Sequence, residues 1–467
     1  MSRINTNISS LKAIHTLTRN QNDLNTRLQR LSTGLKINTG KDAPAGLIAS
    51  ETLRSEINGI HQAIDNSQRA GNVINTAEGA LSEVSALLLE VQSLTNEAAN
   101  TGALSPEEIK ANQLQVDAIL NSVNRIANTT QFNGIKLLNG SLDYTTSGVA
   151  STAIDNLQIN SSKIPDNGTV SVIVQVVASA QLAEVGYAAA GIGAAPVTIQ
   201  IAGNAGVEQL SFAASTANSA VAVAINQITA ATGVSAVLSG TDLRITSTAF
   251  GSKQFVSVTT LTGTFANGKD NGQDAEVNIN GSTAEVDGLT ASVRSENLDI
   301  KVDLDATFGT TIDPAGTTFS VTGGGAKFQL GSQVNRQGQI NVGVGAVSTS
   351  NLGNGVEGFL SSIQSGGTNS LISGNTIQSQ KIITAAIRQV ADLRGRLGAL
   401  QKNVFETNVN SLSVALENVT ASESAIRDAD FAEETSKLTR SQILVQANTS
   451  ILSQANSSPQ QVLSLLG

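Results

Sequence analysis

The stretch LQRLSTGLKINTGKDAPAGLIASE, from Leu28 to Glu51, separates two long helical patterns by a short break. The first pattern runs into Gly34, and the second begins at Pro44. A proline in the first helical turn forgoes no hydrogen bond, so Pro44 fits a helix start. Nothing in the stretch has the character of a catalytic site. It predicts two amphipathic helical arms joined by a short connection.

The arm before the break carries apolar residues at steps of three and four, the narrow seam typical of coiled coils. Burying one such side chain yields about 1.5–3 kcal/mol, whereas fixing each backbone residue costs about 1–2 kcal/mol. One arm packed against one partner is therefore marginal, and we expect its order to come from many packed copies. The seam comprises Ile4, Ile8, Leu11, Ile14, Leu17, Leu24, Leu28, Leu31 and Leu35.

Helical periodicity continues after the break and returns at the C-terminal end. Ser105, Pro106 and Glu108 have the spacing of a capping box with a first-turn proline, which predicts a new helix after residue 105. A helix is also expected from about 376 to 428, followed by a last arm. The apolar positions of this arm are Phe431, Leu438, Val445, Leu452, Val462, Leu463, Leu465 and Leu466.

The middle of the chain reads as strands and turns. Alternating or β-branched runs occur near 169–177, 196–203, 209–213, 276–286 and 319–331, with a hairpin at 234–248 and one helix at 216–232. The expected fold is therefore α+β and multi-domain. A long antiparallel coiled-coil bundle forms from both chain ends, and a β-rich insertion lies between them. Both termini should lie at one end of an elongated molecule.

Composition excludes several classes of protein. The 467 residues carry a net charge of −9, which argues against a nucleic-acid-binding footprint. Residues 141–375 hold 8 basic and 17 acidic residues, so the acidity belongs to the middle. The chain has no cysteine, which excludes disulfides and thiolate metal sites. We expect no cofactor and no metal site, because neither an HExxH motif nor a phosphate-binding loop is present. We also expect no membrane span and no Sec-type signal peptide, because no long apolar run is present.

Four segments in order resemble the signatures of bacterial flagellin. They are the opening stretch, NTAEGALSEV (75–84), RIANTTQFNGIKLLNG (125–140) and the C-terminal QANTSILSQANSSPQQVLSLLG (446–467). The resemblance covers about 1–140 and 376–467, and Gly467 stands where flagellins often end in arginine. A segment near 208–258 is similar to a small repeat module of some flagellins and hook-associated proteins.

This resemblance implies a structural subunit of the flagellar filament, not an enzyme, that self-assembles outside the cell. It implies terminal arms at 1–45 and 429–467 in the filament inner core. A helical rod at 46–140 and 376–428 and a β-rich outer region at 141–375 complete the subunit. The outer region could include a β-hairpin of the rod and one or two outer domains. The implied partners are further copies, an export chaperone, the type III exporter, and the cap and hook–filament junction proteins.

One departure from the usual flagellin sequence concerns recognition by the innate immune receptor. Flagellins that the innate receptor detects usually carry arginine where Glu90 and Gln92 stand here, whereas Leu94 is retained. Replacing a cation by an anion should weaken a complementary contact, so receptor recognition is not expected. Two alternatives stay open at this stage: a hook-associated junction protein, and a glycan-binding adhesin. The second is disfavoured by the scarcity of aromatic residues, which form 3% of the chain.

Overall fold

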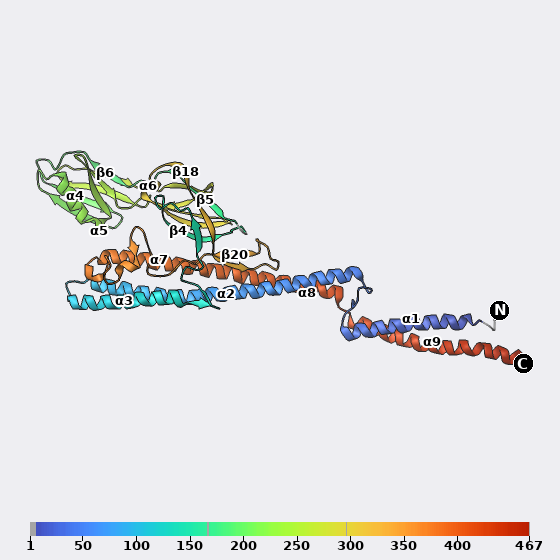
Figure 1. Ribbon diagram of the computed structural model, residues 1–467. Helices are drawn as coiled ribbons and strands as arrows, with labels where there is room; N and C mark the ends of the chain where they lie inside the picture. The colour runs from blue at the N-terminus through green and yellow to red at the C-terminus, as the bar shows by residue number, and fades with distance from the viewer. Residues whose placement is uncertain (1–5, 166–167, 296, 467) are drawn as a thin grey trace. The chain divides into compact units, whose positions relative to one another are not determined.

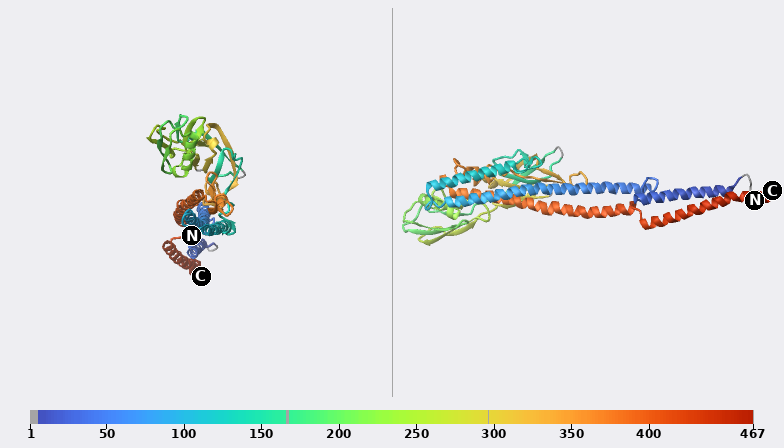
Figure 2. Two further views of the ribbon diagram at one scale, coloured as in Figure 1. Left: turned by 90° about the vertical axis from the view of Figure 1, so that its left-hand side faces the viewer. Right: turned by 90° about the horizontal axis from the view of Figure 1, so that it is seen from below.

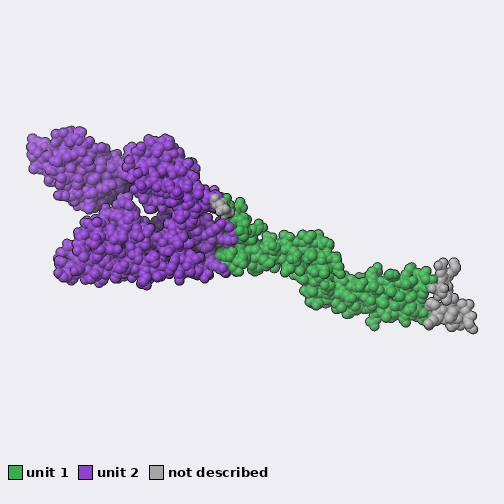
Figure 3. Space-filling view, viewed as in Figure 1, with its two compact units in different colours: residues 1–68, 330–338, 406–467 green, residues 69–329, 339–405 purple. Residues whose placement is uncertain are grey.

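The computed structural model describes residues 6–165, 168–295 and 297–466, with side chains described as far as residue 458. The chain divides into two compact units (Figure 3). Unit 1 comprises Met1–Gln68, Leu330–Gly338 and Glu406–Gly467, and unit 2 comprises Arg69–Gln329 and Gln339–Phe405. Each unit is thus built from segments that are far apart in the sequence.

Unit 1 contains helix α1 (Ile8–Thr33) packed antiparallel to helix α9 (Phe431–Leu466) (Figures 1 and 2). It also contains the first part of α2 (Pro44–Ala98) and all of α8 (Thr407–Arg427). The side chain of Asn7 caps α1 by accepting from the backbone N–H of Ser10 at 3.0 Å. At the other end Gly34 adopts φ 73°, the left-handed C-cap for which glycine is favoured. The break expected from the opening stretch is therefore present.

The connection between α1 and α2 contacts the connection between α8 and α9. Leu35 forms an isolated antiparallel bridge with Asp428. The backbone N–H of Lys36 donates to the carbonyl of Arg427 at 2.7 Å, and that of Ala429 donates to Gly34 at 2.9 Å. We call this contact the backbone clasp. It satisfies backbone groups that the helix ends leave free.

The helical part of unit 2 consists of the rest of α2, helix α3 (Pro106–Thr129) and helix α7 (Thr376–Leu400), which lie side by side (Figures 1 and 2). The predicted capping box is confirmed, because Ser105 and Glu108 cap each other reciprocally. A π-helical turn, Gln401–Glu406, joins α7 to α8. The fully buried positions of the three helices follow the predicted apolar periodicity and include Leu81, Val84, Leu88, Val116, Val123, Ala386, Val390 and Leu397.

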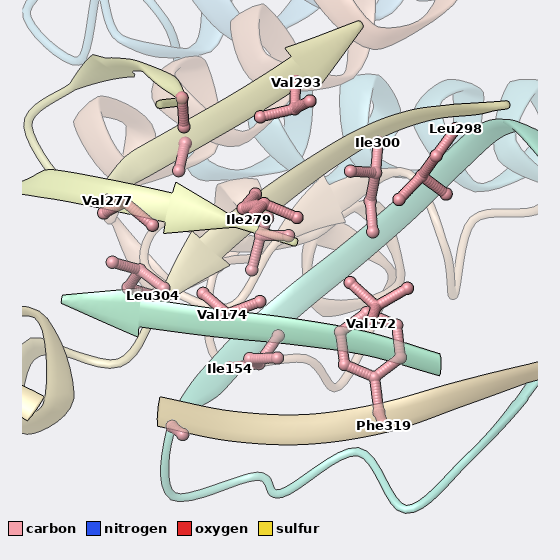
Figure 4. Close-up of a cluster of buried hydrophobic side chains, with 14 of the residues drawn as sticks. Ile154, Val172, Val174, Val277, Ile279, Val293, Leu298, Ile300, Leu304 and Phe319 are labelled. Carbon is pink, nitrogen blue, oxygen red and sulfur yellow. The ribbon is translucent and has the colours of Figure 1, made fainter. Parts of the chain in front are cut away.

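The insertion forms two β-rich cores. In the first, a five-stranded sheet of order β14-β13-β5-β18-β3 and a four-stranded sheet of order β15-β16-β17-β4 share one hydrophobic cluster (Figure 4). Alternate residues of β5, β13, β16 and β17 point into it, as a two-layer β packing requires. The strands are β3 (Tyr144–Ser147), β4 (Ile154–Ser162), β5 (Val170–Ala178), β13 (Glu276–Ile279), β14 (Ser282–Thr283), β15 (Glu285–Asp287), β16 (Thr290–Arg294), β17 (Leu298–Leu304) and β18 (Asp313–Gly324).

The second core is inserted between β5 and β13 of the first. It combines sheets of order β12-β11-β7-β8 and β6-β10-β9 with helices α4 (Asn218–Gln227) and α5 (Thr229–Thr232). Its strands are β6 (Glu184–Tyr187), β7 (Val197–Gly203), β8 (Val207–Phe212), β9 (Val234–Ser239), β10 (Asp242–Ser247), β11 (Phe255–Thr262) and β12 (Gly268–Asn271). The predicted hairpin at 234–248 is β9–β10. The single helix predicted at 216–232 is instead two helices, because Ile228 leaves helical geometry.

Short elements complete the fold. They are the pairs β1 (Gln131–Phe132) with β2 (Ile135–Lys136), β19 (Ala326–Gln329) with β20 (Gln339–Val342) and β21 (Gly353–Asn354) with β22 (Gly358–Phe359), helix α6 (Ala306–Gly309), and 3₁₀ turns at Leu360–Ile363 and Leu371–Ser373. Among the described residues, none of the helices is both long and apolar enough to span a bilayer.

Candidate self-assembly site

Helices α1 and α9 meet along a seam whose positions alternate at steps of three and four. This spacing is that of a coiled coil, in which one stripe of each helix faces the other. All of these positions are at least half-buried in the single chain. On α1 the seam is Ser10, Ala13, Leu17, Asn20, Leu24, Arg27 and Leu31, and on α9 it is Glu434, Leu438, Ser441, Val445, Asn448, Leu452 and Ala455.

Polar contacts fix which residues of the two helices oppose each other. The Asn7 side chain donates to the carbonyl of Ala455 at 2.8 Å. The Ser10 hydroxyl donates to the Asn456 carboxamide oxygen at 2.7 Å. Toward the clasp, the hydroxyl of Ser441 donates to the carboxylate of Asp23 at 2.9 Å. The pairing is therefore antiparallel along the whole described length.

A buried ionic cluster lies at the clasp end of the seam. Arg27 Nη1 donates to both carboxylate oxygens of Glu434, at 3.0 and 3.1 Å. Arg30 Nη1 donates to one of these oxygens, Oε1, at 3.3 Å. Glu434 is only 4% exposed. Burial opposes its charged form, yet the hydrogen bonds from Arg27 and Arg30 outweigh burial and hold the pKa of this carboxyl below its ordinary value. Burial likewise lowers the pKa of Arg27, but the contacts with Glu434 and with Asp23 at 3.3 Å raise it overall.

A second, apolar face of the same two helices is uncovered in the single chain. On α1 the exposed residues are Ile8, Leu11, Ile14 and Leu28, and on α9 they are Ile443, Leu444 and Ile451, with exposures between 39% and 63%. Phe431 is 61% exposed, but it is seven residues before Leu438 and lies on the seam stripe at the start of α9. The sequence pattern had placed all α1 positions on one narrow seam. The structure instead divides them, because a helix with one neighbour in its own chain buries one stripe only. Leu17, Leu24, Leu31 and Leu35 are half-buried, and Leu438, Val445 and Leu452 face the α1 side.

Some predicted positions lie outside what the structure describes. Ile4 precedes the described residues, and only the helical backbone is described for Val462, Leu463, Leu465 and Leu466. Sequence reasoning missed Ile443, Leu444 and Ile451, although the seven-residue spacing of the last two indicates a second stripe on α9. It also missed the Arg27–Glu434 contact, which joins residues 407 positions apart.

The residues considered for immune recognition lie on α2. Glu90 is exposed, Gln92 is half-buried and Leu94 is 8% exposed. Leu94 is therefore part of the helical core. Of the three residues, Glu90 alone is charged, and its side chain is exposed to solvent.

Comparisons with known proteins identify the family of this chain. The family models for the bacterial flagellin N-terminal and C-terminal helical regions match residues 4–143 and 380–466. Polar flagellin B/D of Vibrio parahaemolyticus is 31% identical over 465 residues, and B-type flagellin of Pseudomonas aeruginosa is 30% identical over 507 residues. Both alignments cover 99% of each chain. The chain belongs to the bacterial flagellin family.

As a flagellin, the protein is a structural subunit of the flagellar filament, is extracellular, and serves motility through self-assembly. Its full-length relatives are flagellins, so a junction protein or adhesin is not favoured. A solved structure of the flagellar hook-associated protein-3 from Legionella pneumophila covers 80% of this chain and 97% of that one. It is 15% identical to this chain, with a TM-score of 0.31.

Proposed function

We propose that the paired helices α1 and α9 form the inner core of the filament, and that neighbouring subunits cover their exposed apolar face. The supporting observation is that one stripe of each helix is buried within the chain while a second apolar stripe stays exposed. A large exposed apolar stripe is a feature of interaction surfaces. Segments 1–45 and 429–467 are the terminal arms in this assignment.

The remaining segments follow from the same assignment. The helices of 46–140 and 376–428 form a rod outside the core, and residues 141–375 point outward. Two separate hydrophobic clusters in this region support two outer domains. The segment near 208–258, expected to be a repeat module, falls within the second cluster, which runs from Ala183 to Phe265.

Export before assembly is part of the proposal. A chain destined for a filament outside the cell has to cross the envelope, and the type III exporter is the expected route. The apolar positions of α9 are the expected binding site of an export chaperone, which would keep this face covered before secretion. Cap and hook–filament junction proteins are the expected partners at the two ends of the filament.

The test is assembly of the purified subunit onto sonicated filament seeds, viewed by electron microscopy. The proposal expects micrometre-long helical filaments from the full chain. A chain lacking residues 1–34 and 431–467 should remain monomeric, whereas its two β-rich cores stay folded. Long filaments from the shortened chain would contradict the assignment of the arms to the core.

A further inference from the structure

The apolar layers of the α1–α9 seam do not by themselves specify how the two helices pair. On both helices the large apolar seam residues recur every seven positions: Leu17, Leu24 and Leu31 on α1, and Leu438, Val445 and Leu452 on α9. A slide of seven residues brings large apolar side chains opposite each other again. Pairing α1 with a second α1, or α9 with a second α9, does the same. In coiled coils a polar seam residue commonly removes such ambiguity.

The cluster of Arg27, Arg30 and Glu434 distinguishes these pairings by charge. In the observed register the carboxylate of Glu434 contacts both guanidinium groups at 3.0 to 3.3 Å. A slide of seven residues places Glu434 opposite Asn20 or Gly34, where no cation occupies the seam. Two α1 helices side by side would oppose arginines, and two α9 helices would oppose glutamates. The slipped and α9–α9 pairings leave Glu434 without its counter-ions, which is strongly unfavourable for a buried charge. An α1–α1 pairing leaves Arg27 with only Asp23 of its own helix, at 3.3 Å, and brings like charges together.

The backbone clasp does not supply the same discrimination. It consists of main-chain contacts between residues 34–36 and 427–429. These contacts adjoin the end of α1 and the start of α9, so a slide within one chain would break them. They hold no charge that rejects a like helix of another copy. In the filament core proposed above, the α1 and α9 helices of many copies would be crowded together. Rejection of wrong pairings would then require a side-chain element within the seam.

We propose that Arg27, Arg30 and Glu434 form a pairing lock, which commits α1 to α9 in a single register during assembly and excludes slipped and like-helix pairings. The inference rests on the proposed place of these helices in the filament core. It goes further by assigning the specificity of pairing to three residues. They act as positioning residues, because they set the register in which the exposed apolar face is presented.

The chain has no cysteine, so engineered pairs report the register directly. The pair Ser10→Cys/Asn456→Cys reports the observed register, in which these side chains are 2.7 Å apart. The pair Ser10→Cys/Thr449→Cys reports a slide of one heptad. Intrachain disulfide yields are measured in seeded filaments under mild oxidation. An unpaired buried charge disfavours the slipped register by on the order of 100-fold, so we expect about that yield ratio for the native cluster.

Glu434→Leu should lower this ratio to below about 10-fold, because the cost of burying an unpaired charge is then removed. The clasp and the contacts Asn7–Ala455 and Ser441–Asp23 remain, so some preference for the observed register is kept. Glu433→Leu is the matched control: it is the same substitution on an adjacent, exposed side chain outside the seam, and should keep the native ratio. A merely stabilising role predicts no change in the ratio. Glu434→Leu filaments that keep the native ratio would therefore overturn the proposal.

Charge exchange gives an independent readout, which also decides the case if Glu434→Leu does not elongate. Glu434→Arg should stop elongation, and Arg27→Glu/Arg30→Glu/Glu434→Arg should restore it to within about 10-fold of the native rate. A triple variant no better than Glu434→Arg overturns the lock. If the helices do not enter the core, Leu11→Ala leaves elongation unchanged. If only the lock is wrong, Leu11→Ala weakens elongation while charge exchange fails to rescue it.

Discussion

Trimming the exposed face of α1 should weaken filament growth without weakening the subunit. Leu11 is 51% exposed in the single chain, so neighbours have about half of its surface left to cover. Full burial of a leucine is worth about 1.5–3 kcal/mol, and Leu11→Ala removes most of the side chain. The expected loss is therefore about 1 kcal/mol per subunit, which raises the critical concentration roughly 5-fold. The triple variant Ile8→Ala/Leu11→Ala/Ile14→Ala should raise it about 100-fold, if the effects add.

The assay is sedimentation of seeded filaments at a series of subunit concentrations. Alanine favours helix at least as well as leucine or isoleucine, so loss of α1 helicity is not an alternative explanation. Val207→Ala is the control, because Val207 is 54% exposed but lies on β8, outside the helical arms. The control should leave the critical concentration unchanged. A native critical concentration for the triple variant would refute the reasoning.

Gln113, which is fully buried in α3, donates to one main-chain carbonyl and accepts from one main-chain N–H of the 360–373 segment. Gln113→Leu should therefore lower the free energy of unfolding by about 2–6 kcal/mol, measured by urea denaturation. Because the pKa of Glu434 is lowered in the folded chain, its stabilising effect is present above the unfolded value of about 4.3 and is lost as pH falls through the folded pKa. The critical concentration should thus be flat from pH 7 to 5 and rise below about 4, with a weaker rise in Glu434→Gln. Finally, the native chain should activate the innate flagellin receptor weakly in a reporter cell assay, and Glu90→Arg/Gln92→Arg should increase the signal; potent signalling by the native chain would contradict this.

The sequence by itself determined the helical ends, their breaks and the β-rich nature of the insertion. These features depend on interactions between residues close in the chain. The reciprocal capping of Ser105 and Glu108 spans one helical turn. The left-handed cap of α1 needs only a glycine at the position that follows the helix, which Gly34 supplies. The chain-end signatures also identified the family, which the full-length relatives then confirmed.

Only the tertiary structure decided which apolar residues of α1 face α9 and which stay exposed. A run of leucines at steps of three and four fits several stripes equally well, so Leu24 and Leu28 could not be told apart before a partner was in place. The same holds for the contact between Arg27 and Glu434 and for the insertion of one β-rich core into another. Such features depend on pairing between residues hundreds of positions apart, for which the local pattern carries no information. The physical reason is that burial is a property of the surroundings of a side chain, and distant parts of the chain create those surroundings.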